Sequence, residues 1–299
     1  MRNFGATWGA PPARSCRIGA CGSRGRLLGL AAFGRGVARI VSPPARLVHT
    51  PRVVARDAEV GEAGALRARV DALAWAEIGR DLDAIGHARV PELLTADECV
   101  ALADLFGEDA RFRKTVDMQR HRFGVGAYRY FNRPLPAPVE ALRRACYPHL
   151  ARIANDWQQR LGSSERFEGT LPAFLARCAA AGQRQPTPLL LRYEAGGFNC
   201  LHQDLYGAVA FPLQLAIGLS RPDRDFRGGE FLLVEGRARQ QSRGEVIALR
   251  QGEAAVFPTR ERPVESARGT SRAQVRHGIS RLHAGIRVTL GIIFHDAES

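Results

Sequence analysis

The sequence predicts a mainly β fold with additional helices, in which a helical first half packs on an all-β second half. Before residue 186, apolar residues recur mostly at helical spacing. After Pro186, short runs rich in β-branched and aromatic residues are separated by Gly, Pro and Asp clusters. Such a series of short strands favours a barrel or jelly roll over an alternating α/β sheet. With 299 residues, the chain is long enough for one sizeable core.

The elements of the first half follow from periodicity and capping signals. Residues 58–86 alternate Ala, Leu and Val with charged residues at helical spacing, which predicts a helix. Thr95 and Glu98 form a capping box that opens a helix to about Phe106. Tyr128–Phe131 has strand character, and further helices are expected at about 139–160 and 171–181.

The second half is expected to hold seven strands and one inserted loop. The predicted strands are Leu189–Tyr193, Ala208–Leu219, Gly229–Glu235, Glu245–Leu249, Ala254–Phe257, Arg272–Ile279 and Gly285–Phe294. The stretch Thr259–Ala273 carries several arginines and is interpreted as a loop near the mouth of the site. The expected organisation is therefore a helical support with a few strands over 58–185 and a β core over 186–299.

Residues 1–57 are set apart by their composition. The first 56 residues contain ten arginines and no acid, are rich in Gly, Pro and Ser, and have no structural period. This composition predicts disorder, either as an organellar transit peptide or as an extension without consequence. A secretory signal fits worse, because the apolar run Leu27–Phe33 is short, late and followed by more arginines.

Composition excludes some functional classes. The net charge of +13 lies mostly in the first 56 residues, which leaves about three charges for the rest, so nucleic acid is not expected as a partner. No apolar run is long enough for a membrane span. The six cysteines form no CxxC pair, which favours reduced core cysteines and a cytoplasmic location, unless the first segment directs the chain to an organelle.

A candidate metal site begins with the pair His202 and Asp204, which follows a Gly-rich turn. In an extended chain, residues two apart point to the same side, so both side chains can reach one metal ion. An imidazole and a carboxylate suit iron(II), and a second histidine would complete a 2-His-1-carboxylate triad with positions left open for substrates. By itself the HxD pair is a weak signal, because it occurs often by chance.

The third ligand is expected from a distant strand, and His277 is favoured for it. His283 lies only four residues before Arg287, and His295 lies past the end of the last strand. Arg287 shares the small, polar face of its strand with Thr289, and a charged residue there needs a partner. A dicarboxylate would supply one through a bidentate contact, and pairing with an acid such as Glu230 is the alternative.

Taken together, these motifs resemble the iron(II)- and 2-oxoglutarate-dependent oxygenases, nearest to the prolyl and lysyl hydroxylase type. The resemblance covers roughly residues 186–296. It is carried by YxxGGxNxxHxD at Tyr193–Asp204, Gly228–Phe231, Val256–Pro258, and HxxxxxxxGxR at His277–Arg287, in this order. It implies a double-stranded β-helix (jelly-roll) core with a helical N-terminal support.

For individual residues, the resemblance implies that His202, Asp204 and His277 bind iron(II). Arg287 would bind the distal carboxylate of 2-oxoglutarate, with Tyr193 and Thr289 as hydroxyl donors to it. The implied reaction consumes 2-oxoglutarate and oxygen, releases succinate and carbon dioxide, and hydroxylates a C–H bond. Ascorbate (vitamin C) is implied as the reductant that maintains the iron.

Two other functions compete with this hypothesis. One is oxidative demethylation of nucleic acid, which the modest charge of residues 57–299 disfavours. The other is a cupin-like module that binds metal without turnover, which the triad together with Arg287 disfavours. Fold and cofactor do not select the prime substrate among a protein side chain, an amino acid and a small metabolite. The oligomeric state has no signal in the sequence.

Overall fold

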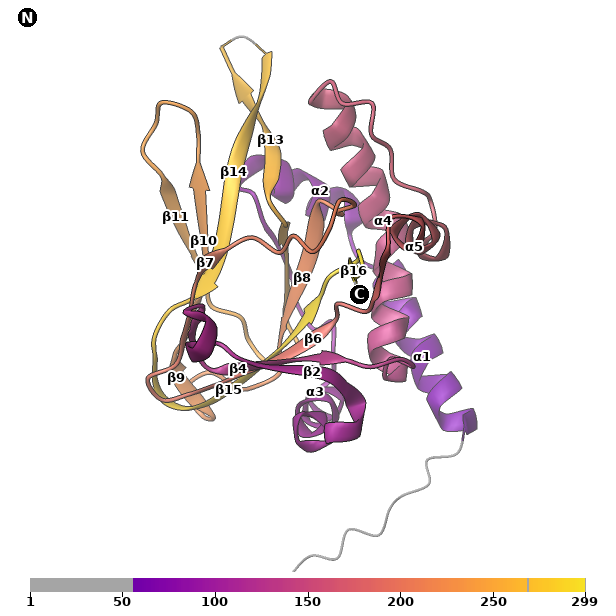
Figure 1. Ribbon diagram of the computed structural model, residues 1–299, viewed down its shortest axis with the longest axis vertical. Helices are drawn as coiled ribbons and strands as arrows, with labels where there is room; N and C mark the ends of the chain where they lie inside the picture. Colours follow the sequence, from indigo (N-terminus) through magenta and orange to yellow (C-terminus); the bar gives the residue numbers. More distant parts are fainter. Residues whose placement is uncertain (1–55, 268, 299) are drawn as a thin grey trace, which may run out of the picture. The chain divides into compact units, whose positions relative to one another are not determined.

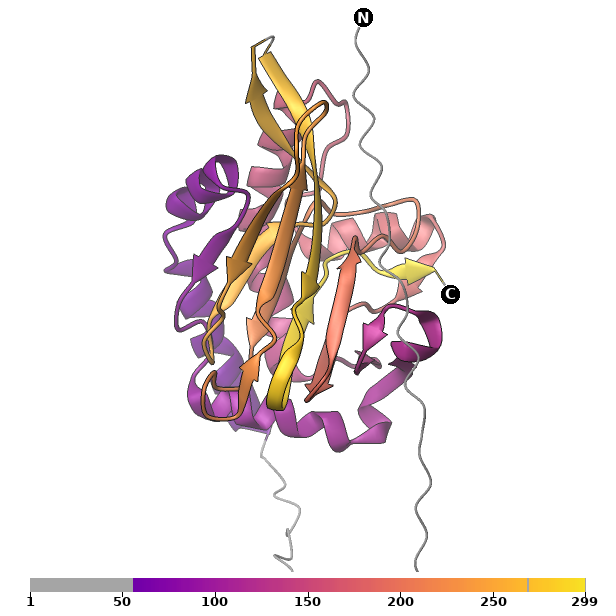
Figure 2. The same cartoon turned by 90° about the vertical axis from the view of Figure 1, so that its left-hand side faces the viewer.

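The computed structural model describes residues 56–267 and 269–298, with side chains from Gly64 onward. The expectations for residues 1–57, as disordered or targeting segment, therefore lie almost entirely outside the described residues. Two antiparallel sheets form the β core, and helices cover the larger one (Figures 1 and 2).

The larger sheet has eight strands and takes in strands from both halves of the chain. Its strands, in order across the sheet, are β1 (Ala88–Val90), β12 (Ala254–Pro258), β8 (Leu213–Gly218), β15 (Leu282–Ile292), β6 (Leu189–Glu194), β4 (Ala127–Phe131) and β2 (Phe112–Asp117), with β9 (Phe226–Gly228) paired to β15. The first half thus widens the sheet at both of its edges.

The smaller sheet has six strands and faces the larger one across the core. It consists of β11 (Arg243–Ile247), β10 (Phe231–Gly236), β14 (Gly269–Ile279), β7 (Phe198–His202) and β3 (Gly124–Val125), with β13 (Glu261–Ser266) paired to β14. A separate pair joins β5 (Gln183–Gln185) to β16 (Ala297–Glu298).

The connections between the sheets are those of a double-stranded β-helix. The chain runs through β6, β7, β8, β10, β11, β12, β14 and β15, and each sheet receives four of these strands. Their spatial orders are β12-β8-β15-β6 and β11-β10-β14-β7, so the chain winds between two facing sheets. The jelly-roll prediction is confirmed.

Helices pack on the outer face of the larger sheet. They are α1 (Arg56–Asp71), α2 (Trp75–Ala84), α3 (Ala96–Asp104), α4 (Ala137–Arg160) and α5 (Leu171–Ala180), with 3-10 turns at Leu105–Gly107, Asp109–Arg111 and Gln119–His121. One buried cluster joins Trp157 and Leu150 of α4 to Ile217 and Leu290 of the sheet. The other face of the sheet is left for the cavity between the sheets. Among the described residues, no helix is both long and apolar enough to cross a membrane.

Most predicted elements are present with shifted ends. The capping box of Thr95 and Glu98 is formed, and it opens α3. The helix expected over 58–86 is two helices, because the chain turns at residues 72–74. The strand expected over Ala208–Leu219 is confined to β8, and residues 208–212 precede it as irregular chain.

The loop expected at Thr259–Ala273 is wrong, because residues 261–266 and 269–273 of this stretch lie in the paired strands β13 and β14. The reason is a buried ion pair: Nε of Arg262 lies 2.6 Å from Oε2 of Glu235 on β10. The same guanidinium donates to the carbonyl oxygen of Asp83 on α2 at 2.7 Å. An arginine that looks like a loop residue in the sequence thus fixes the hairpin to a helix and to the smaller sheet.

Candidate active site

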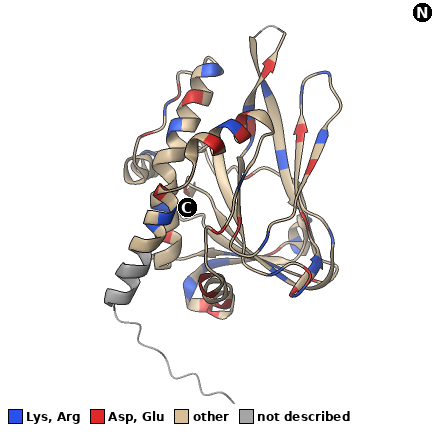
Figure 3. Ribbon diagram, turned by 180° about the vertical axis from the view of Figure 1, so that it is seen from behind, with Lys and Arg blue, Asp and Glu red and all other residues tan. Residues whose placement is uncertain are grey.

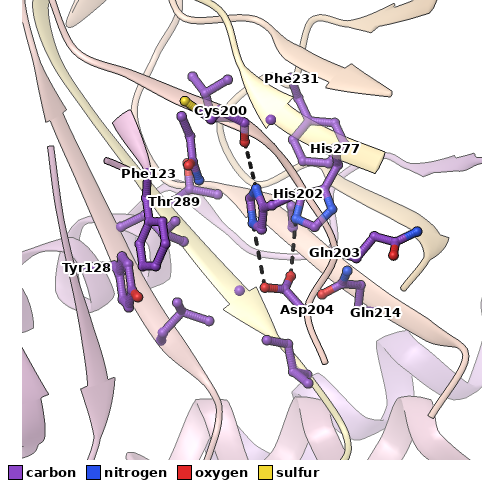
Figure 4. Close-up of a pocket in the computed structure, with 18 of the residues that line it drawn as sticks. Phe123, Tyr128, Cys200, His202, Gln203, Asp204, Gln214, Phe231, His277 and Thr289 are labelled. Carbon is purple, nitrogen blue, oxygen red and sulfur yellow. Dashed lines mark hydrogen bonds and ion pairs between the residues drawn. The ribbon is translucent and has the colours of Figure 1, made fainter. Parts of the chain in front are cut away.

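Three potential metal ligands meet at the cavity-facing side of the smaller sheet (Figure 4). His202 ends β7, and it pairs directly with His277 in β14. Asp204 lies two residues beyond β7. Its Oδ2 is 3.1 Å from Nε2 of His277, and its Oδ1 is 3.5 Å from Nε2 of His202. One donor atom from each residue lies within 4.8 Å of the others, so the three predicted ligands do come together.

A glycine allows the two histidine strands to approach closely. Gly278 follows His277, and a Cβ at this position would lie 2.7 Å from the backbone oxygen of Asn199 on β7. Real Cβ atoms essentially never make such a contact. Any larger residue would push β14 away from β7, and the two imidazoles would separate. The sequence His277–Gly278 is therefore part of the geometry of the site.

Neighbouring groups orient the ligands. Nδ1 of His202 bonds the carbonyl oxygen of Cys200 at 2.8 Å, which directs Nε2 toward Asp204. The hydroxyl of Tyr206 donates to Oδ1 of Asp204 at 2.6 Å. The ring of His277 packs against Phe257 at a centroid distance of 4.9 Å, so an apolar wall holds it. Such supporting contacts are typical of metal sites.

The electrostatics give a donor set suited to a cation. Burial alone would raise the pKa of Asp204, but the charges and hydrogen bonds of His277 and His202 outweigh it and hold that pKa well below its usual range. Burial, together with the charge of His202, lowers the pKa of His277. Asp204 is therefore ionised and His277 neutral at neutral pH, as metal binding requires. Two imidazoles and one carboxylate that leave a face open fit iron(II).

The second predicted feature, Arg287, lies on β15 in the wall of the same cavity. Its side chain is buried, with 3% of the residue exposed, and its Nη1 donates to Oγ1 of Thr289. No carboxylate of the described residues lies within ion-pair distance of it. Burial lowers the pKa of Arg287 to about 10. The alternative partner, Glu230, instead bonds the hydroxyl of Ser280.

Tyr193 lies beside this arginine. The Arg287 guanidinium is 6.0 Å from the centre of the Tyr193 ring. The Tyr193 hydroxyl is buried and has no hydrogen-bond partner among the described residues. Arg287, Thr289 and Tyr193 thus place a cation and two hydroxyl groups at one end of the cavity. A carboxylate that enters this end of the cavity would pair with the guanidinium.

The cavity between the sheets has a volume of about 410 Å³ and holds both groups of residues. Phe123 stands at its mouth, 48% exposed, next to Arg122. The lining also includes the aromatic and amide side chains of Tyr128, Tyr130, Tyr206, Gln214, Phe231 and Phe257, of which the sequence analysis missed Tyr206. Tyr206 continues the two-residue spacing of His202 and Asp204, a signal that could have revealed it.

The competing histidines lie elsewhere. His283 packs beside Gly228, away from the triad, and it does not line the cavity. His295 is fully buried, and its Nδ1 accepts the backbone N–H of Phe211 at 3.2 Å. His277 is therefore the third member of the cluster.

Comparison with known proteins gives one family. Residues 126–297 match the model of a family described as "Oxygenase, catalysing oxidative methylation of damaged DNA". An uncharacterized protein of Mycobacterium tuberculosis, present in strains CDC 1551 / Oshkosh and ATCC 25618 / H37Rv, is 48% identical over 192 residues. This match covers 62% of this chain and 82% of the relative.

Similar solved structures include a prolyl-4-hydroxylase of Pseudomonas putida, 16% identical, covering 74% of this chain and 98% of the other, with a TM-score of 0.43. A 2OG-Fe(II) oxygenase family oxidoreductase of Burkholderia pseudomallei is 17% identical, covering 76% and 95%, with a TM-score of 0.44. A prolyl hydroxylase of Trichoplax adhaerens is 13% identical, covering 78% and 93%, with a TM-score of 0.48.

Proposed function

The chain belongs to the oxygenase family whose model it matches over residues 126–297, and we propose that it is an iron(II)- and 2-oxoglutarate-dependent dioxygenase that hydroxylates a C–H bond. Membership confirms the prediction of an oxygenase and disfavours the cupin-like module that only binds metal. We propose iron(II) as the metal, 2-oxoglutarate as the co-substrate and hydroxylation as the reaction.

One observation carries the choice of co-substrate: the buried, unpaired guanidinium of Arg287 lies in the same cavity as the triad. A buried charge without a counter-charge costs several kcal/mol, so its retention needs a reason. An anionic ligand that enters the cavity supplies that reason. A carboxylate matches the planar guanidinium through two parallel hydrogen bonds. 2-Oxoglutarate offers such a carboxylate at one end and a metal-chelating keto acid at the other.

Each residue then has a definite task. His202, Asp204 and His277 would hold the iron and leave one side of it open to the cavity. Arg287, with the hydroxyls of Thr289 and Tyr193, would bind the distal carboxylate of 2-oxoglutarate. When bound, iron and 2-oxoglutarate would together activate dioxygen, which is the oxidant: one of its oxygen atoms would enter succinate as 2-oxoglutarate loses carbon dioxide, and the other would convert a C–H bond into C–OH.

The surrounding residues control water and orientation. Phe231 and Phe257 pack around His277 and keep solvent from its ring. Tyr206 holds one oxygen of Asp204, so the carboxylate keeps a fixed orientation toward the histidines. The protein's contribution is therefore a dry cavity and fixed ligand geometry, while the bound groups carry the redox chemistry.

Nucleic acid is a second candidate for the prime substrate, because the family is described as acting on damaged DNA. Hydroxylation of a methyl group on a base uses the same C–H chemistry. An exposed aromatic pair at the cavity mouth, His121 stacked on Phe123 at 5.4 Å, offers a surface on which a base could stack. Acidic and basic residues are interspersed along the helices in Figure 3, which favours no extended phosphate-binding face there.

The decisive experiment is an anaerobic titration of the full chain with iron(II) and 2-oxoglutarate. We expect a weak visible charge-transfer band that is absent in an Asp204→Ala variant. If wild-type protein gives no band, the proposal is wrong. Succinate release is then measured with oligonucleotides carrying N-methylated bases, with peptides, and with metabolite mixtures. Formaldehyde release with methylated DNA alone would select the second candidate, whereas a hydroxylated peptide or metabolite would exclude it.

The role of ascorbate and the cytoplasmic location are also part of the proposal. Ascorbate is expected to prolong turnover rather than to start it, because its task is to reduce iron that has been oxidised without product formation. Time courses with and without ascorbate measure this difference. Immunolocalisation of the full chain tests the cytoplasmic location against the organellar alternative.

A further inference from the structure

The residue between two of the metal ligands is bound to a distant part of the chain. Gln203 follows His202 and precedes Asp204. Neighbouring residues of an extended chain point to opposite sides, and Figure 4 shows the Gln203 amide directed away from the Asp204 carboxylate. Its Nε2 donates to the carbonyl oxygen of Val275 at 2.8 Å and to that of Arg260 at 3.1 Å. The amide donor thus binds two backbone oxygens that lie far away in the sequence.

The two acceptors lie at the base of the β13–β14 hairpin. Val275 comes two residues before His277 in β14, and Arg260 directly precedes β13. The N–H of Val275 donates to the carbonyl oxygen of Arg260 at 2.7 Å, so the two acceptors are themselves joined. Gln203 therefore fastens the chain just before Asp204 to the strand that carries the third metal ligand.

Asp204 lies outside the strands that fix the two histidines. β7 ends at His202, which pairs with His277 in β14, whereas the described chain after β7 is irregular until β8 begins. The position of Asp204 therefore depends on side-chain contacts rather than on a strand ladder. Tyr206 holds its carboxylate from within the irregular chain. Gln203 connects this chain to the hairpin from the other side of Asp204.

The hairpin has support of its own. Six residue pairs join β13 to β14, and the buried ion pair between Arg262 and Glu235 binds the hairpin to the smaller sheet. The Gln203 side chain is only half-buried and contributes two hydrogen bonds to carbonyl groups at the base. Of the two segments that Gln203 joins, the irregular chain is the one without a ladder, so these bonds chiefly restrain that chain.

We propose that Gln203 is a positioning residue of the metal centre, which holds the carboxylate of Asp204 beside His277 by fastening the preceding chain to the β13–β14 hairpin. This inference rests on the proposed function. A ligand that is already in place loses less conformational freedom when the ion binds, so metal affinity is higher. The amide points away from the ion, so it acts on metal affinity through Asp204.

The test replaces Gln203 by Met, which keeps the length of the side chain and removes both hydrogen bonds. Mn(II) affinity is measured anaerobically by calorimetry on the metal-free full chain. We expect about 10-fold weaker Mn(II) binding, the size typical of a lost contact that orients a metal ligand. At saturating Mn(II), the affinity for 2-oxoglutarate should stay the same, because Asp204 is then already in place.

A matched control separates this role from a general loss of hydrogen bonds. Gln251 precedes β12, and its Nε2 donates to the carbonyl oxygen of Leu219 at 3.0 Å. Gln251→Met and Gln203→Met should both lower the Tm of the metal-free protein slightly, but only Gln203→Met should weaken Mn(II) binding. If Gln203→Met does not fold, Gln203→Asn withdraws the amide by one methylene and should show the same selective loss of Mn(II) affinity.

A double variant tests whether the effect passes through Asp204. Tyr206→Phe loosens the same carboxylate, so Gln203→Met combined with it should weaken Mn(II) binding by clearly less than the product of the two single losses. A loss equal to that product would overturn the inference, because the two side chains would then act on different groups. Unchanged Mn(II) affinity in Gln203→Met, or an equal loss of Mn(II) and 2-oxoglutarate affinity, would also overturn it. If wild-type protein binds no metal, the proposed function itself fails, which is a different result.

Discussion

Replacing Arg287 by Met should stabilise the ligand-free protein while it abolishes co-substrate binding. Burial lowers the pKa of Arg287 to about 10, against an ordinary value of 12.5. A pKa difference of one unit corresponds to 1.36 kcal/mol, so the charged guanidinium destabilises the folded, ligand-free protein by about 3 kcal/mol. Below pH 10 the arginine is protonated in both folded and unfolded chains, so the full penalty applies at neutral pH. It fades only as pH rises from about 10 toward 12.5.

The assay is thermal unfolding of metal-free protein, with and without 2-oxoglutarate and Mn(II). A gain of about 3 kcal/mol in a domain of this size raises Tm by roughly 6–12 °C. Mn(II) should raise the Tm of both proteins, because both keep the three metal ligands. Addition of 2-oxoglutarate to the Mn(II)-loaded protein should raise the Tm of wild type further and leave that of Arg287→Met unchanged, because the variant cannot hold the distal carboxylate. A ligand-free variant that melts below wild type would refute the reasoning, since Arg287 would then be a structural cation.

Arg143→Met is the matched control. Arg143 is just as buried as Arg287, but it has partners: Nη2 lies 2.8 Å from Oδ1 of Asp296 and 2.6 Å from the carbonyl oxygen of Phe294. Its removal breaks a buried ion pair and should cost about 3–5 kcal/mol. A rise in stability for Arg287→Met and a loss of stability for Arg143→Met would show that the missing counter-charge, and not burial as such, distinguishes the arginine that binds the co-substrate.

Three further predictions concern the metal ligands and the hairpin. Tyr206→Phe removes the hydrogen bond to Asp204 and should weaken iron(II) binding about 10-fold, as measured by anaerobic metal titration, with little change in Tm. An unchanged iron(II) affinity would contradict this prediction. Although burial opposes it, the hydrogen bond and charge of Asp204 raise the pKa of His202. Below that pKa a metal ion must displace a proton from His202, so metal affinity should drop about tenfold for each pH unit. A metal affinity that does not change between pH 7.5 and 5.5 would contradict this prediction. Arg262→Met leaves Glu235 without its shortest ion pair and should lower the free energy of unfolding, measured in urea, by about 3 kcal/mol. An unchanged free energy of unfolding would show that the hairpin does not depend on this ion pair.

The parts of the site that could be predicted are those whose spacing is local or whose chemistry is unusual. His202 and Asp204 are two residues apart, and this spacing alone directs both toward one point. Arg287 is the charged residue of a strand whose other residues are mostly apolar or small, which indicates that it binds an anionic partner. Both signals are visible in the sequence because each depends on only a few neighbouring positions.

The remaining parts depend on contacts between strands far apart in the chain. The sequence leaves Gln214 open between a contact to substrate or co-substrate and a structural amide, and only the pairing of β8 with β12 shows that it is buried opposite Phe257. Arg262 lies in a stretch rich in arginine that looks like a loop. Its strand conformation follows from Glu235, 27 residues earlier, which no local pattern reveals. The features that the sequence predicted wrongly or did not predict thus depend on contacts with residues that are distant in the sequence.

The three metal ligands do not share the same mechanical setting. His277 lies inside a ladder, with β10 on one side and β7 on the other, whereas Asp204 belongs to irregular chain that precedes β8. Amide hydrogen exchange in β14 should therefore be slow with or without metal, while amides near Asp204 should exchange fast in apo protein and slow down when the ion binds. The histidine strand would act as a fixed template, and the carboxylate segment would become ordered on it as the metal arrives.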